Sequence, residues 1–196
     1  MKTINIKYVD TTPVVCNITY EEYPESPRTW DNLGKMVLKH NKYHLAMEAD
    51  IDFDDFVGWD EVEKYLRDEH EAYIVLPVQM HEHSSINIYV GDSHDRWDGG
   101  QLGFIFATRE DIKAWFEVER VTQAARERAI ACLTAEVDDY SKYIDGECYR
   151  FTLERAADGA YIDSCGGYYN TNDIKAELSE YENIIYKFDG VEQDWL

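Results

Sequence analysis

A continuous apolar stripe between residues 121 and 144 is the feature that most constrains the fold. Its positions recur at intervals of four, four, four, four, three and four residues. They are Val121, Ala125, Ala129, Leu133, Val137, Tyr140 and Ile144. This period matches an α-helix, in which residues three or four apart share one face, and Gly146 is typical of a helix end. Since such a stripe must be buried, the sequence predicts one long helix over 121–144 packed on a sheet.

The remaining periodic segments predict the sheet and the shorter helices. Alternating or β-rich stretches lie at 4–8, 14–20, 72–80, 85–90, 101–107, 148–154 and 160–165. Helices are expected from Trp30, at 60–70, from Thr108 and at 173–188. Thr108 and Asp111 have the spacing of a capping box. The pattern therefore predicts an α+β fold with a mixed or mainly antiparallel sheet.

The length of 196 residues suits one domain that buries a core without disulfide support. No Gly/Ser linker, low-complexity tract or repeat interrupts the chain. We therefore expect a single compact α+β domain over 1–196, with 156–196 as a candidate C-terminal subdomain. Four scattered cysteines lack a CxxC pair, so we expect reduced thiols.

The charge balance is strongly acidic and uneven. Forty Asp and Glu residues face nineteen Lys and Arg residues, which gives a net charge of -21. Most of the excess lies at 48–71 and at 156–196, with net charges of -9 and -7. Such a balance argues against direct binding to nucleic acid or to an anionic membrane. No apolar run approaches a membrane span and the first ten residues contain no apolar signal core, so we expect a cytoplasmic protein.

The acidic block 48–71, EADIDFDDFVGWDEVEKYLRDEHE, is the main candidate for a partner-binding site. Its acids are Glu48, Asp50, Asp52, Asp54, Asp55, Asp60, Glu61, Glu63, Asp68, Glu69 and Glu71. A solvated acidic face is one interpretation. A calcium loop is another, although Asp55 stands where such a loop requires glycine. The third is mimicry of nucleic acid, with Trp59 or Tyr65 at the edge as contacts or as part of the core.

The charge count and the size of the chain are compatible with mimicry. B-DNA carries one charge per ~1.7 Å of axis, so 21 charges correspond to about 36 Å of duplex. A compact chain of this length has a diameter of roughly 40 Å. The composition is therefore compatible with a protein that imitates a DNA duplex. Whether the charges form a stripe depends on the fold.

Catalytic and metal-binding motifs are weak. His81, His83 and Asp95 form a loose cluster that matches no stringent metal spacing. Cys165 precedes two glycines and is the candidate nucleophile, with core packing at a strand end as the plainer interpretation. There is no GxSxG and no GxxxxGK[ST] motif. We therefore expect no enzyme activity, no cofactor and no metal, and keep the His81/His83/Asp95 cluster as the alternative.

Two segments carry a family resemblance: SPRTWDNLG at 26–34 and WDGGQLGFI at 97–105. Together with 81–90, 143–151 and 161–169, they resemble a family of small proteins encoded by phages, plasmids and conjugative elements of gut bacteria. This chain has Ser84-Ser85 where the family often has Ser-Gly. The resemblance assigns no catalytic residues.

The resemblance implies a mobile-element protein, and many such proteins counter host defence. Acidic antirestriction and anti-CRISPR proteins are the analogues. We therefore expect a DNA mimic in the cytoplasm of a bacterial host. It would inhibit a CRISPR effector or restriction enzyme by binding its basic nucleic-acid channel. The alternative is an enzyme or sequestering protein that acts on a nucleotide or signalling molecule through His81, His83 and Asp95.

Overall fold

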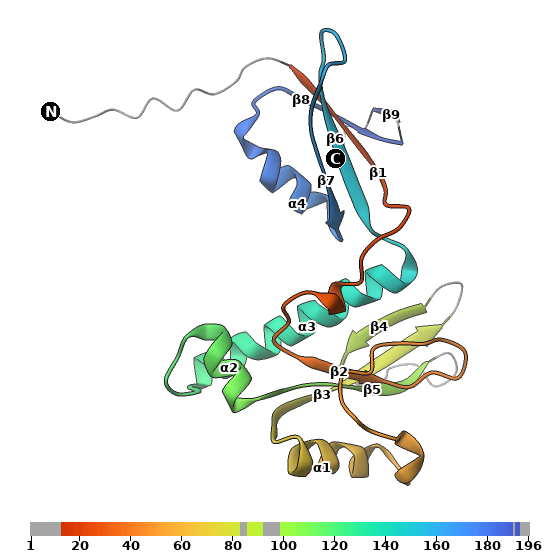
Figure 1. Ribbon diagram of the computed structural model, residues 1–196, viewed down its shortest axis with the longest axis vertical. Coiled ribbons are helices and arrows are strands. Elements are labelled where there is room, and N and C mark those ends of the chain that lie inside the picture. Colours follow the sequence, from red (N-terminus) through yellow and green to blue (C-terminus); the bar gives the residue numbers. More distant parts are fainter. Residues whose placement is uncertain (1–12, 83–85, 92–98, 190, 193–196) are drawn as a thin grey trace, which may run out of the picture. The chain divides into compact units, whose positions relative to one another are not determined.

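The computed structural model describes residues 13–82, 86–91, 99–189 and 191–192 (Figure 1). Contacts divide the chain into two compact units. The terminal unit is Met1–Glu25 with Gly146–Leu196, and the central unit is Ser26–Asp145. The predicted α+β class is confirmed, as is the long helix packed on a sheet. The segment predicted as a subdomain, 156–196, lies in the terminal unit together with the first strand of the chain.

The central unit is built on an antiparallel four-stranded sheet of order β2-β5-β3-β4. The strands are β2 Lys35–Leu38, β3 Ala72–Glu82, β4 Ile86–Val90 and β5 Gly99–Thr108. The helices are α1 Trp59–Glu69, α2 Arg109–Phe116 and α3 Gln123–Asp145, with short 3-10 turns η1 Pro27–Thr29 and η2 Phe53–Asp55. The predicted capping box of Thr108 and Asp111 opens α2.

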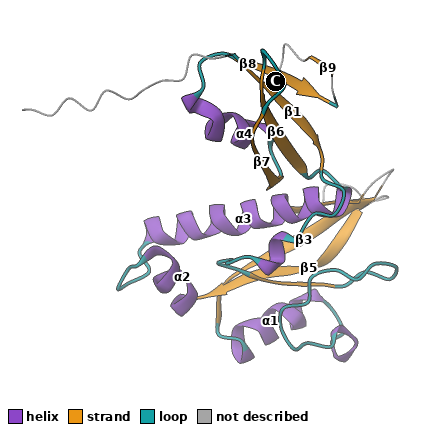
Figure 2. Cartoon of the chain, turned by 45° about the horizontal axis from the view of Figure 1, so that its top comes forward, coloured by secondary structure: helices purple, strands orange, loops and turns teal. Residues whose placement is uncertain are grey.

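Helices α3 and α1 lie on opposite faces of this sheet (Figure 2). Under α3, Leu133 and Val137 pack into one core cluster with Ile74 and Ile105. Under α1, Val62 and Leu66 pack into a second cluster with Phe104 and Phe106. Because successive strand residues point to opposite faces, β5 contributes side chains to both clusters. The sheet is therefore buried on both faces.

The terminal unit contains a mixed sheet of order β7-β6-β1-β8-β9. The strands are β1 Val14–Tyr20, β6 Tyr149–Arg155, β7 Tyr161–Tyr168, β8 Ile184–Phe188 and β9 Val191–Glu192. Strand β1 pairs antiparallel with β6 and parallel with β8. Helix α4 Thr171–Glu177 and turn η3 Leu178–Glu180 bury Ile174 and Leu178 in its core.

Two predicted helices are wrong. The segment after Trp30 forms strand β2, whose three consecutive buried residues pair with β5. The predicted helix 173–188 ends at Glu177, and its last part is strand β8, which pairs with β1. In both segments the spacing of the apolar residues is compatible with a helix and with a strand. Pairing with a distant strand decides which of the two forms.

Candidate functional site

The acidic block occupies one continuous part of the central unit: the segment before η2, η2 itself, helix α1 and the turn into β3. It lies on the side of the sheet opposite α3 (Figure 2). Nine of its eleven acids are exposed. These nine, here called the acidic surface, are Asp50, Asp52, Asp54, Asp55, Asp60, Glu61, Asp68, Glu69 and Glu71. The structure therefore presents most of the predicted site residues to solvent.

The other two acids have internal partners. Glu48 accepts hydrogen bonds from the Arg28 guanidinium at 2.6 and 2.8 Å and from the Met36 amide at 2.7 Å. Glu63 pairs with Arg67 at 2.7 Å, one helical turn along α1. Glu48 therefore stabilises the fold of the central unit. Both Glu48 and Glu63 are left out of the acidic surface.

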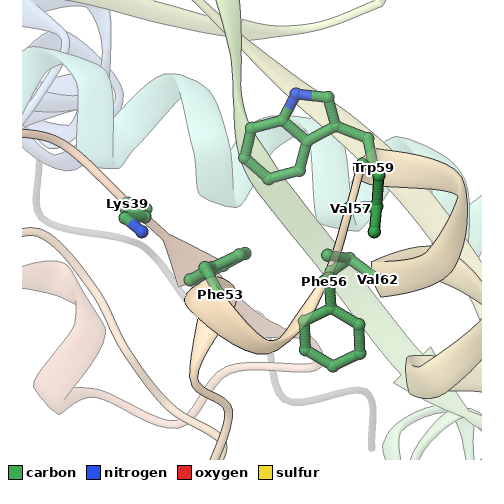
Figure 3. A pocket seen from close by; sticks show the side chains of 7 residues that line it. Lys39, Phe53, Phe56, Val57, Trp59 and Val62 are labelled. Atoms are coloured by element: carbon green, nitrogen blue, oxygen red, sulfur yellow. The ribbon is translucent and has the colours of Figure 1, made fainter.

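An apolar hollow of about 240 Å³ lies within the acidic block (Figure 3). Its lining residues are Lys39, Phe53, Phe56, Val57, Gly58, Trp59 and Val62. The Trp59 ring makes edge contacts with Phe53 and Phe104, with centroids 5.7 and 5.9 Å apart. Val57 is 94% exposed. The hollow therefore combines aromatic walls with an apolar side chain that projects into solvent.

Acidic hollows adjoin this apolar hollow on both sides. The first shares Lys39 and Phe53 with it and includes Asp50, Asp52 and Asp54. The second shares the segment 57–59 with it and includes Asp60 and Glu61. An apolar centre with a charged rim is the usual anatomy of a protein-binding surface.

Local hydrogen bonds fix the loop that carries these carboxylates. Asp52 caps η2 by accepting from the Asp54 amide at 3.0 Å. Glu61 accepts from the Val57 amide at 2.8 Å. Each amide bonds to one carboxylate oxygen, so the second oxygen of either side chain can accept a hydrogen bond from a partner. The acidic surface therefore has little conformational freedom to lose on binding at these two positions.

The acidic surface is not a uniform stripe. Helix α1 also exposes Lys64 and Arg67, which separate Asp60 from Asp68 and Glu69 on the helix surface. The densest group of carboxylates is therefore at 50–61, around η2 and the first turn of α1.

The calcium interpretation of the block has no structural support among the described residues. No group of three or more His, Cys, Asp or Glu residues in the described ranges could hold a metal ion. Asp54, the third acid of the calcium-like spacing, forms an ion pair with Lys39 at 2.5 Å. His81 lies on β3, whereas His83 and Asp95 lie outside the described residues.

The glycines after Cys165 serve a structural contact. The Gly167 amide donates to the Glu21 carboxylate at 2.7 Å. A Cβ at Gly166 would lie 2.4 Å from the same carboxylate, so any larger residue would require the Glu21 side chain to shift. Because a carboxylate already occupies this amide and would repel an oxyanion, the arrangement does not form the oxyanion pocket that a Cys165 nucleophile would need.

All four cysteines are free, as expected from their spacing. Burial raises the pKa of Cys16 to about 12. Burial, and then the neighbouring Glu136 carboxylate, raises the pKa of Cys132 to about 11. Burial also raises the pKa of Cys148. These three thiols are therefore protonated and unreactive near neutral pH.

We expect dithionitrobenzoate to modify Cys165 first, because only its side chain is exposed among the four. One thiol per chain should react rapidly at pH 8, and the other three should react only when denaturant is added. Absorbance of the released thiolate measures both steps. The Cys165→Ser variant should lose the rapid step, and rapid release of two or more equivalents by the native protein would contradict the assignment.

The segment SPRTWDNLG owes its pattern to a buried ion cluster that the sequence analysis missed. Arg28 donates to Glu48, to Glu136 at 3.0 Å and to the Gly34 carbonyl at 2.7 Å. A Cβ at Gly34 would lie 2.3 Å from Leu133. These contacts fix the segment against α3, so folding explains its Arg28 and Gly34.

The segment WDGGQLGFI enters β5 from Gly99 onward, and its residues before Gly99 lie outside the described ranges. A Cβ at Gly103 would lie 2.0 Å from the Val37 carbonyl oxygen of β2. Glycine is therefore required for the close approach of the two strands. The two segments with the strongest resemblance thus have structural roles in the central unit.

No family model, curated protein or solved structure matches this chain. Within the described ranges, every helix is too short or too polar to cross a membrane.

Proposed function

We propose that this chain is an acidic inhibitor from a mobile genetic element that binds a bacterial defence complex. The partner is a CRISPR effector or restriction enzyme with a basic nucleic-acid-binding channel. The acidic surface occupies this channel as a DNA mimic, without binding nucleic acid and without catalysis or a cofactor. One observation carries the proposal: nine acids from Asp50 to Glu71 are exposed, and five of them line the hollows that adjoin the apolar hollow.

The charge of this surface favours a basic partner. A channel that binds phosphates presents clustered Lys and Arg side chains, and carboxylates can pair with the same groups. Complementary potentials accelerate encounter and exclude acidic competitors. The apolar hollow adds area that excludes water at the centre, so the contact does not depend on charge alone.

The dense part of the acidic surface can be neutralised without damage to the fold. We expect replacement of Asp50, Asp52, Asp54 and Asp55 by Asn to weaken partner binding at least about tenfold at low salt. The melting temperature should stay unchanged or rise slightly, because Asn also caps η2 at position 52 and like-charge repulsion is relieved. Binding of the unmodified protein should weaken steeply as salt rises.

The partner is obtained first, by protection assays in hosts with and without their restriction or CRISPR genes, followed by pull-down. The matched control replaces four exposed acids elsewhere on the central unit by Gln: Glu110, Glu117, Glu119 and Glu127. This control should bind and protect like the unmodified protein. Full protection by the four-Asn variant would contradict the proposal and leave these carboxylates a solvated face.

A further inference from the structure

The apolar hollow differs from the rest of the acidic surface because it combines aromatic rings with one cation, Lys39, while carboxylates line the hollows beside it. Phe53 and Trp59 form walls, and Lys39 lies at the edge (Figure 3). The Lys39 ammonium is 2.5 Å from Asp54, which lines the adjoining hollow. We propose that this hollow receives one arginine side chain of the partner protein. This inference rests on the proposed function and names the contact that makes the acidic surface selective.

The lining favours a cationic side chain with an apolar stem. A guanidinium over an aromatic face is attracted by the negative centre of the ring, and Trp is the strongest such acceptor. The stem of the same side chain removes apolar wall surface from water. Carboxylates in the adjoining hollows, such as Asp52 and Asp54, are available to the charged end.

Lys39 is the cation with which an incoming arginine would compete at this hollow. Its ion pair with Asp54 is accessible, because the two side chains are 41% and 83% exposed. Such exposed pairs contribute little to stability, so a partner group can displace Lys39 from Asp54. The ion pair therefore holds Asp54 in place in the free protein, and Asp54 exchanges Lys39 for the partner's arginine on binding.

The size of the hollow fits one side chain. Its volume of about 240 Å³ is below the ~300–1,000 Å³ of sites that enclose drug-sized ligands. It is several times the ~30 Å³ that one water occupies in the liquid. A single long side chain inserted from a larger partner surface is thus a better match than a free small molecule.

The N-terminus of α1 lies at the hollow, and a helix N-terminus usually favours an anion, but the neighbouring carboxylates reverse this preference. Gly58 caps α1 without a side-chain hydrogen bond, so the helix end carries partial positive charge. Asp60 and Glu61 lie in the first turn and offset this charge. With Asp52 and Asp54 on the other side, the surroundings favour a cation.

Arginine suits these walls better than lysine. Its planar guanidinium stacks on aromatic rings, is weakly hydrated and pairs with a carboxylate through two parallel hydrogen bonds. Arginine is also enriched at the residues that dominate binding energy in interfaces. A nucleic-acid channel supplies it in abundance.

Two labelled peptides test the inference: three arginines separated by glycines, and the same peptide with lysines. Fluorescence anisotropy at low salt should show that the unmodified protein binds the arginine peptide about threefold tighter or more. The Trp59→Leu variant should lose this preference and bind both peptides at the lysine level. The matched control Trp115→Leu, at a half-exposed tryptophan on α2, should keep it.

A second variant, expected to bind more tightly, distinguishes loss of the site from loss of the fold. Lys39→Gln removes the competing cation and should raise affinity for the arginine peptide about twofold or more, which misfolding cannot produce. Equal binding of both peptides by the unmodified protein would overturn the arginine site while leaving the acidic surface intact. An unchanged preference in a folded Trp59→Leu variant would overturn it too. Failure of both peptides to bind would contradict the proposed function as well.

Discussion

Replacing Leu133 by Asp is expected to unfold the central unit. Leu133 is fully buried, and its side chain packs against the backbone of Gly34 and against Ile105. Truncation of a buried leucine alone costs about 2–5 kcal/mol. A carboxylate buried among these apolar side chains adds several kcal/mol, since the nearby Arg28 already pairs with Glu48 and Glu136. The sum is comparable to the ~5–15 kcal/mol that stabilises a whole domain.

Circular dichroism during heating measures this effect, since α3 is the longest described helix. The matched control is Ala131→Asp, two residues earlier on the exposed face of α3. It should lower the free energy of unfolding by less than about 1 kcal/mol, the difference in helix propensity. A folded Leu133→Asp protein with an unchanged melting temperature would show that the stripe does not form the core.

The stripe of α3 could be predicted because it extends over six turns of one period, too long for a strand. Strand β2 could not be predicted, because its four residues contain three consecutive buried side chains and no alternation. Its structure depends on pairing with β5, which lies some 65 residues away in the sequence. Local pattern therefore defines long helices well, whereas short strands depend on distant partners.

The candidate site shows the same division. Exposure of the carboxylates at 50–61 follows from their hydrophilicity and could be predicted. The apolar hollow could not, because Lys39 follows β2, Phe53 lies in η2 and Val62 lies on α1. Only tertiary packing brings these residues together. The sequence analysis considered Trp59 as a contact or as core, and in the structure it contributes to both the hollow and the core cluster under α1.

The buried ion cluster at Arg28 connects three segments that are far apart in the sequence. Its side chain and that of Glu136 are 7% and 10% exposed, and Glu136 also accepts from the Leu33 amide at 2.7 Å. Burial alone would lower the pKa of Arg28, but hydrogen bonds and charge attraction from Glu48 and Glu136 outweigh it and raise the pKa. The cluster therefore holds the segment before β2 onto α3 through a permanently charged arginine.

Replacing Arg28 by Met should accordingly lower the free energy of unfolding by about 3–5 kcal/mol, because Glu48 and Glu136 are left as partly buried carboxylates without their cation. For a chain of this length, the melting temperature should fall by roughly 6–20 °C.

Two further variants test the physical cause. If the loss of stability comes from carboxylates left without their cation, the triple variant Arg28→Met, Glu48→Gln, Glu136→Gln should recover part of it. Arg28→Lys should be intermediate, since lysine keeps the charge but not the two-pronged contact. If Arg28→Met melted like the unmodified protein, the cluster would contribute nothing to stability, and the SPRTWDNLG segment would need a functional explanation.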